Sequence, residues 1–205
     1  MIMKDFVEKE SPKVSVESYI GDPLGAGISL PRLSDVARGA LVKLLSSPKA
    51  FPHILWGRMK MAKEALVSDG FLRDFPLRLR FGFKPVAYMR DGGEVCFTTG
   101  ALLFRSSAVT LSVFCHELSH MYLSQRSFYP ELKELQGEFL ERFSSESGCE
   151  LMSPIELYAM ALSVDIMDNI AQSLVEGKHK DKLRLLIDSE REKITFLVSK
   201  IKKLK

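Results

Sequence analysis

The chain has 205 residues, which suits one domain with helical additions and is too short for two domains of ordinary size. Hydrophobic residues make up 46% of it and charged residues 27%, a mixture that can build a core and excludes wholesale disorder. With 29 Lys and Arg against 26 Asp and Glu, the net charge is +3, so the composition indicates no nucleic-acid-binding surface.

The cysteines and the apolar segments bear on the cellular compartment. Cys96, Cys115 and Cys149 are an odd number of cysteines without a Cys-x-x-Cys pair, which favours a reducing compartment over a disulfide framework. Residues 1–14 are rich in charge and lack the apolar centre of a signal peptide. No apolar run approaches the roughly 18–20 residues of a membrane helix. We therefore expect a cytoplasmic protein without a membrane partner.

The N-terminal third of the chain predicts a leader followed by helices. Residues 1–30 contain a Gly/Pro cluster and no sustained periodicity, so they are expected to form a mostly irregular leader before a single domain at 31–205. Apolar residues at helical spacing then predict two amphipathic helices, at 34–45 and 54–66, which cover one side of the core.

A different pattern predicts strands between Pro76 and Phe97. Leucines alternate with arginines at the start of residues 77–83, which is typical of a strand. Two short apolar runs, at 86–88 and 95–97, flank the sequence Arg-Asp-Gly-Gly and predict a β-hairpin. We expect a small, mainly antiparallel sheet.

Helical periodicity dominates the rest of the chain. It predicts helices at 108–124, 131–143, 154–175 and 181–201. A small sheet followed by a run of helices favours an α+β fold, with its core at about 75–175 and additional helices at both ends. The segment 178–205 has an excess of Lys and Arg and predicts a basic C-terminal helix that docks on the core.

The sequence His116-Glu117-Leu118-Ser119-His120 is a candidate metal-binding motif. On a helix, residues four apart lie on one face, so His116 and His120 can present ring nitrogens to one ion. Such nitrogens lie about 2.0–2.1 Å from a zinc ion. Glu117 projects about 100° around the helix from His116, where it reaches a zinc-bound water without becoming a ligand.

This motif predicts zinc-dependent hydrolysis. Zinc lowers the pKa of a bound water toward about 7 and polarises the carbonyl under attack, while Glu117 accepts the proton of the water as general base. Apolar residues on both sides of the motif predict a buried helix, in which unpaired imidazoles would be costly. The alternative is a core helix whose histidines hydrogen-bond to the backbone or to neighbouring carboxylates.

A catalytic zinc ion needs three protein ligands and an open position. The residues alone leave the third ligand open among nine acidic residues and one histidine downstream: Glu131, Glu134, Glu138, Glu141, Glu146, Glu150, Glu156, Asp165, Asp168 and His179.

Two segments resemble a known family. Residues 113–120 read Val-Phe-Cys-His-Glu-Leu-Ser-His, and residues 155–163 read Ile-Glu-Leu-Tyr-Ala-Met-Ala-Leu-Ser. Together they resemble the zincin-type metallopeptidases of the ImmA/IrrE group, in which the motif helix precedes a helix whose first Glu is the third ligand. The resemblance spans residues 80–170. It implies a zincin-like fold, with the sheet packed against the motif helix, and Glu156 as the third ligand to Zn²⁺.

The role of Glu156 as third ligand has two alternatives. Residues 153–156 form a capping box with proline at the first helical position, so Glu156 also suits the closing of a helix N-terminus. Glu141 is the alternative third ligand because its spacing from His120 is closer to that of thermolysin-like enzymes, and Glu138 lies one turn earlier.

The remaining predictions concern the substrate. Tyr158 and Tyr122, and also Tyr129, are candidates for donating a hydrogen bond to an oxyanion. In zincins a sheet edge beside the metal helix binds an extended peptide, and residues 95–99 are expected to provide that edge. The predicted activity is zinc-dependent hydrolysis of a peptide bond in a protein or peptide. The alternative is a non-proteolytic regulatory protein-binding module on the same fold, which would not need Glu117.

Overall fold

The computed structural model describes residues 15–25, 28, 32–46, 52–90 and 93–204. Their elements are α1 (Val16–Gly21), α2 (Asp35–Leu45), α3 (Pro52–Ser68), β1 (Leu77–Arg80), β2 (Ala87–Arg90), β3 (Glu94–Thr98), α4 (Thr99–Phe104), α5 (Ser107–Ser124), α6 (Tyr129–Phe143), α7 (Cys149–Met152), α8 (Pro154–Ser173) and α9 (Lys178–Ile201). The expected α+β arrangement of a small sheet with several helices is confirmed.

The helices predicted from apolar periodicity are present as α2, α3, α5, α6, α8 and α9. Two of them begin at a serine cap: Ser34 Oγ accepts a hydrogen bond from the Ala37 N–H (3.1 Å), and Ser106 Oγ accepts one from the Val109 N–H (3.2 Å). The short helices α4 and α7 were not predicted, because elements of six and four residues are too short to show a helical period.

The sheet is mixed, so the prediction of a mainly antiparallel sheet is wrong. The strand order is β1-β3-β2. The predicted hairpin is present, since β2 and β3 pair antiparallel. However, β1 pairs with β3 in parallel, because the chain crosses over after β1 instead of turning back beside it. The prediction therefore identified the hairpin and missed the direction of its neighbour.

Part of the predicted leader is helical. Helix α1 occupies Val16–Gly21, and Tyr19 within it is fully buried. The Tyr19 hydroxyl donates a hydrogen bond to the Met152 carbonyl (2.6 Å), and its ring meets that of Phe139 edge-on. An irregular leader is thus wrong for residues 16–21, while residues 1–14 lie outside the described part. The core also extends beyond 75–175, since Leu41 and Leu183 belong to it.

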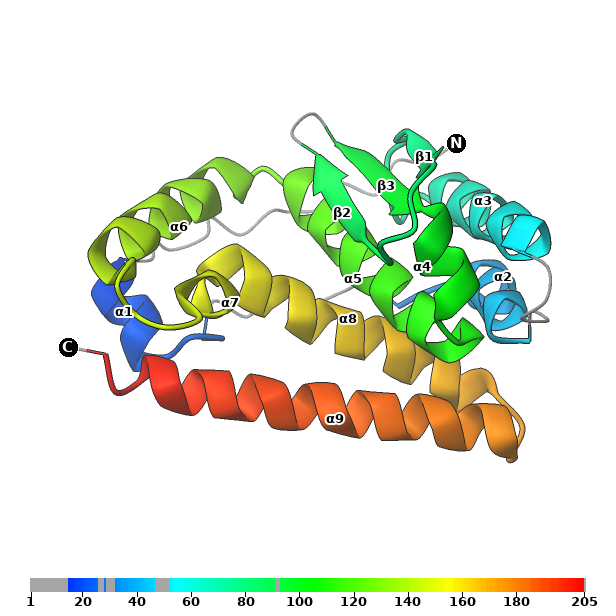
Figure 1. Ribbon diagram of the computed structural model, residues 1–205. Helices are drawn as coiled ribbons and strands as arrows, with labels where there is room; N and C mark the ends of the chain where they lie inside the picture. The colour runs from blue at the N-terminus through cyan, green and yellow to red at the C-terminus, as the bar shows by residue number, and fades with distance from the viewer. Residues whose placement is uncertain (1–14, 26–27, 29–31, 47–51, 91–92, 205) are drawn as a thin grey trace, which may run out of the picture.

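Helix α5 lies in the middle of the molecule. Figure 1 shows the sheet on one side of α5 and α8 on the other, with α9 running beside α8. Buried apolar residues cover most of the α5 surface, as expected for a helix packed on several sides. This packing fixes the motif helix between the sheet and α8. None of the described helices is long and apolar enough to cross a membrane.

The contact of Tyr19 with Met152 predicts a measurable stability effect. Tyr19→Phe leaves the buried Met152 carbonyl without its donor, which should lower the free energy of unfolding by about 1–3 kcal/mol in a denaturant titration. Val36→Ala is the control, because Val36 is 72% exposed and its truncation should change stability by no more than about 0.5 kcal/mol. Equal stability of Tyr19→Phe and wild type would contradict a stabilising role for this hydrogen bond.

Candidate metal centre

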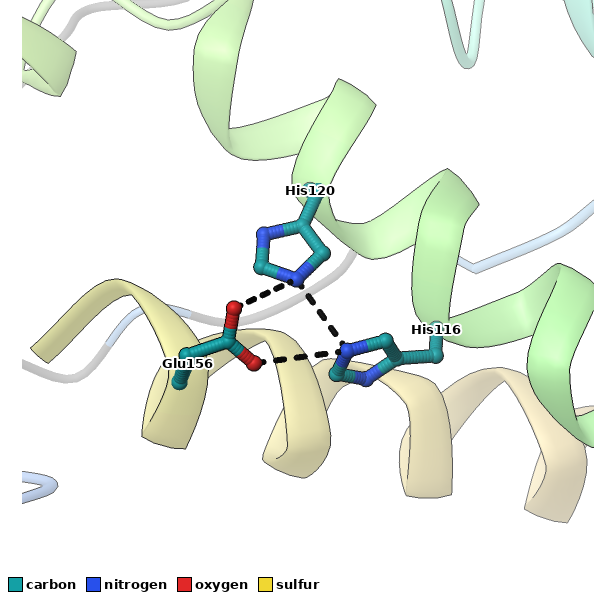
Figure 2. Close-up of side chains that lie close together, drawn as sticks. All are labelled: His116, His120 and Glu156. Carbon is teal, nitrogen blue, oxygen red and sulfur yellow. Dashed lines mark hydrogen bonds and ion pairs between the residues drawn. The ribbon is translucent and has the colours of Figure 1, made fainter. Parts of the chain in front are cut away.

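Three side chains from two helices converge beside the core. His116 and His120 lie one turn apart on α5, and Glu156 lies in the first turn of α8. Figure 2 shows the two rings and the carboxylate pointing toward one another. His116 Nε2 lies 3.1 Å from His120 Nε2. The two carboxylate oxygens of Glu156 lie 3.5 Å from His116 Nε2 and 3.3 Å from His120 Nε2.

The separations among these atoms test whether they fit one ion. Two ligands that each lie about 2.0–2.1 Å from a tetrahedral, zinc-sized ion are about 3.3–3.4 Å apart. The two ring nitrogens are 3.1 Å apart, and Glu156 brings one oxygen to 3.3 Å from His120 Nε2 and its other oxygen to 3.5 Å from His116 Nε2, all close to that value. The group His116, His120 and Glu156 can therefore hold a metal ion, and three ligands leave a fourth tetrahedral position open.

The electrostatics of Glu156 suit a ligand. Burial raises the pKa of Glu156, but its hydrogen bonds with the rings of His116 and His120 outweigh burial and hold the pKa well below its ordinary value. The carboxyl is thus ionised, as metal binding requires.

The alternative of a capping box is wrong. Ser153, the N-cap residue of α8, makes no side-chain capping bond, and its backbone N–H donates to the Glu150 carbonyl rather than to Glu156. The α8 terminus is instead satisfied by Gln136 of α6. Gln136 Oε1 accepts hydrogen bonds from the Ile155 N–H (3.1 Å) and the Ser153 hydroxyl (3.2 Å). This fixes the turn that carries Glu156. An amide within the predicted helix at 131–143 gave no sign of such a role.

Glu117 occupies a different face of α5, toward the sheet. It is buried, with 5% of its surface exposed. Burial raises the pKa of Glu117 to about 7. The charge of His116 opposes this rise, and the negative charge of Glu156 adds to it. A hydrogen bond from the Met89 N–H and the positive charge of Arg105 favour the ionised form. Neither Met89 nor Arg105 was singled out from the sequence, because one contributes only its backbone and the other lies in no motif.

The metal-ligand group is open to small molecules. A cavity of about 200 Å³ adjoins it, lined by His116 and Glu156 together with Glu190 and Lys193 of α9. The side chain of His116 keeps 28% of its surface exposed, so an ion and a solvent molecule can reach the ring. The basic C-terminal helix therefore contributes to the rim of the centre.

The other predicted site residues lie elsewhere. Glu141 and Glu138 are exposed on α6 and do not belong to the ligand group, so the alternative third ligand is not brought to the centre. Tyr122 is directed to Phe71, whose ring centroid is 5.3 Å from its own, and to Arg126. Tyr158 is buried near Tyr19, and burial, with a smaller contribution from Tyr158, raises the pKa of the Tyr19 hydroxyl. Each tyrosine is two residues from a ligand and thus about 200° around its helix.

The strand expected to bind peptide is also misplaced. Residues 95–99 fall mainly in β3, which is the central strand and has neighbours on both sides. Its backbone groups are already paired, so it offers no open edge. The edge strand that packs against α5 is β2.

Comparisons with protein families, curated proteins and solved structures found no match to this chain. The assignment of the centre therefore depends on its own geometry and chemistry.

The ligand set predicts which variants lose metal. Wild-type protein loaded with zinc should hold about one ion per chain, and His120→Ala or Glu156→Gln should each remove it, because two ligands bind far more weakly than three. His179→Ala and Glu141→Gln are controls that should keep the ion, since both residues are exposed and outside the group. The metal content of each variant, measured by mass spectrometry, distinguishes these outcomes. Retention of the ion by Glu156→Gln, or its loss from Glu141→Gln, would contradict the ligand set.

Gln136 predicts a second-sphere effect. Gln136→Leu removes the acceptor for the Ile155 N–H, which should loosen the first turn of α8 and weaken metal affinity by about 10-fold or more. Gln136→Glu is the matched control because it keeps an acceptor oxygen. Competition with a chelator measures both affinities. Equal affinity of Gln136→Leu and wild type would show that Glu156 does not depend on this contact.

Proposed function

We propose that this protein is a zinc-dependent peptidase with a zincin-like fold. The observation that carries the proposal is the convergence of His116, His120 and Glu156 at ligand distances, with the buried carboxylate of Glu117 on the neighbouring face of the same helix. A purely structural cluster would explain the histidine pair. It would not explain why a second carboxylate is buried next to them at a cost.

Zinc is the ion that this donor set favours. Two imidazole nitrogens and one carboxylate with an open fourth position form a ligand set typical of catalytic zinc sites. When bound, zinc supplies a Lewis acid that activates water and polarises a carbonyl group. The residues of this chain then orient the reactants and move the proton.

Glu117 has the position and the pKa of a general base. A general base works best when its pKa is near the working pH, and burial brings that of Glu117 to about 7. The Met89 N–H holds one side of the Glu117 carboxylate, on the face of α5 that adjoins the sheet. From this position the carboxylate accepts a proton from water and passes it to the departing amine. The charge of Arg105 keeps part of the Glu117 population ionised.

The open edge of β2 favours an extended peptide as substrate. The Thr98 N–H donates to the Val86 carbonyl (3.0 Å), so alternation along the antiparallel pair directs the backbone groups of Ala87 and Met89 away from β3. Of these groups, the Met89 N–H donates to the Glu117 carboxylate, so an added peptide pairs with the Ala87 N–H and carbonyl and with the Met89 carbonyl. A peptide that adds to this edge as a strand passes the metal ligands, which corrects the expectation for residues 95–99.

The cytoplasm stays the proposed location. Cys96, Cys115 and Cys149 are all free thiols in the structure, in keeping with a reducing compartment.

Glu117→Gln tests the proposal directly. The variant should keep its zinc and its fold but lose peptide cleavage by about 10²–10⁴-fold, because it removes a base and no ligand. The assay is cleavage of denatured protein or of a peptide pool, followed by mass spectrometry, with zinc content measured in parallel. Glu138→Gln, an exposed carboxylate on α6, is the matched control and should cleave as wild type does.

The same assay separates a peptidase from a non-proteolytic binding module. A zinc-loaded wild-type protein that binds a partner, never cleaves it, and is indistinguishable from Glu117→Gln would contradict the proposed activity.

A further inference from the structure

A second cavity lies along the motif helix, beyond the metal ligands. Its volume is about 460 Å³, and residues from β2, the C-terminal end of α5 and α6 line it. Figure 1 shows the hairpin and the start of α6 at the same end of α5. The size suits one or two amino-acid side chains of a bound peptide.

This cavity lies one helical turn along α5 from the proposed metal ligands. Ser124 lines it and lies four residues after His120, which places it one turn further along the same face of α5, about 6 Å away. Met89 also lines it, and its N–H holds Glu117. A peptide that follows the β2 edge past the centre therefore enters this cavity within one or two residues.

Cationic side chains dominate the charged rim. Arg73, Arg90 and Lys133 line the cavity, with Asp74 as the carboxylate. The charge of Asp74 is already offset by an ion pair with Lys63. Within the described part of the chain, neither the guanidinium of Arg73 nor the ammonium of Lys133 makes an ion pair. The guanidinium of Arg90 lies 3.7 Å from the carboxylate of Glu94, which also pairs with Arg78.

The backbone at Arg73 is held in place. Gln125, the C-cap residue of α5, accepts a hydrogen bond from the Arg73 N–H (2.6 Å) and donates one to the Arg73 carbonyl (3.2 Å). This pair of bonds fixes the segment before β1 to the end of the motif helix. Arg73 is thus presented at the cavity from a fixed backbone, as a recognition residue must be.

We propose that this cavity is a substrate subsite that binds carboxylates near the cleaved bond. The inference rests on the proposed peptidase function and specifies its substrate class. Arg73 and Lys133 attract the carboxylate, and Arg90 joins them when its contact with Glu94 opens. The carboxylate comes from an Asp or Glu side chain or from the C-terminus of the peptide, two sources with the same chemistry.

Binding to a catalytically inactive protein tests this subsite without cleavage. Zinc-loaded Glu117→Gln is titrated with four fluorescein-labelled hexapeptide pools, random except for one fixed Asp or the isosteric Asn, each with a free or an amidated C-terminus. Tighter binding of the Asp pools identifies a side-chain carboxylate, and tighter binding of the free-acid pools identifies the C-terminus. We expect at least one contrast of about tenfold.

Charge reversal in the cavity should abolish that contrast. Arg73→Glu/Lys133→Glu, made in the Glu117→Gln background, changes two exposed residues, so fold and zinc content should be retained and are checked. Lys178→Glu/Lys182→Glu on α9 is the matched control, with the same change in net charge at exposed residues outside the cavity, and should keep the contrast. No contrast in the parent protein, or a contrast that survives reversal in the cavity, would overturn the proposal.

Cleavage of the same pools by protein that retains Glu117 separates the two claims. Cleavage with a preference for carboxylate-bearing peptides supports both. Cleavage of all pools at equal rates, with no contrast in binding, overturns the subsite alone. A contrast in binding without any cleavage overturns the peptidase and leaves a carboxylate-binding cavity.

Discussion

The packing of α5 against α8 is the contact on which the site depends. Each helix alone supplies an incomplete ligand set, with two imidazoles on α5 and one carboxylate on α8. The buried apolar faces of both helices hold these groups within 3.1–3.5 Å of one another. An ion tolerates errors of only a few tenths of an ångström in the positions of its ligands. The sheet, the terminal helices and the Gln136 contact support the packing that keeps the ligands aligned.

Glu117 is buried and Glu156 is half-buried, and the pKa values of these two carboxylates move in opposite directions. Glu156 faces two imidazoles, whose hydrogen bonds lower its pKa in spite of burial. Glu117 faces the sheet and the negative charge of Glu156, and its pKa rises to about 7. The proposed function makes use of this separation of pKa values, with Glu156 as the ionised ligand and Glu117 as the base that exchanges protons near neutrality.

Much of this arrangement could be predicted from the sequence. The spacing of His116 and His120 requires only a helix, and the apolar period predicted that helix within one residue of its start. Glu156 could be selected only through a resemblance, since a capping box and a ligand have the same local sequence. Its true partner at the helix end, Gln136, comes from another helix and leaves no local pattern.

The errors share a physical cause. The direction of β1 and the central place of β3 depend on how elements pack in three dimensions, which periodicity does not encode. Residues that act through the backbone, such as Met89, are invisible to side-chain reasoning.

The most direct test of the central claim is X-ray absorption at the zinc edge of the zinc-loaded protein. Two histidines and Glu156 predict nitrogen and oxygen scatterers at about 2.0–2.1 Å and the multiple scattering of two imidazole rings. Glu156→Gln should change this spectrum, whereas Glu141→Gln should leave it unchanged. A sulfur scatterer at about 2.3 Å, or a spectrum without imidazole, would contradict the centre described for this protein.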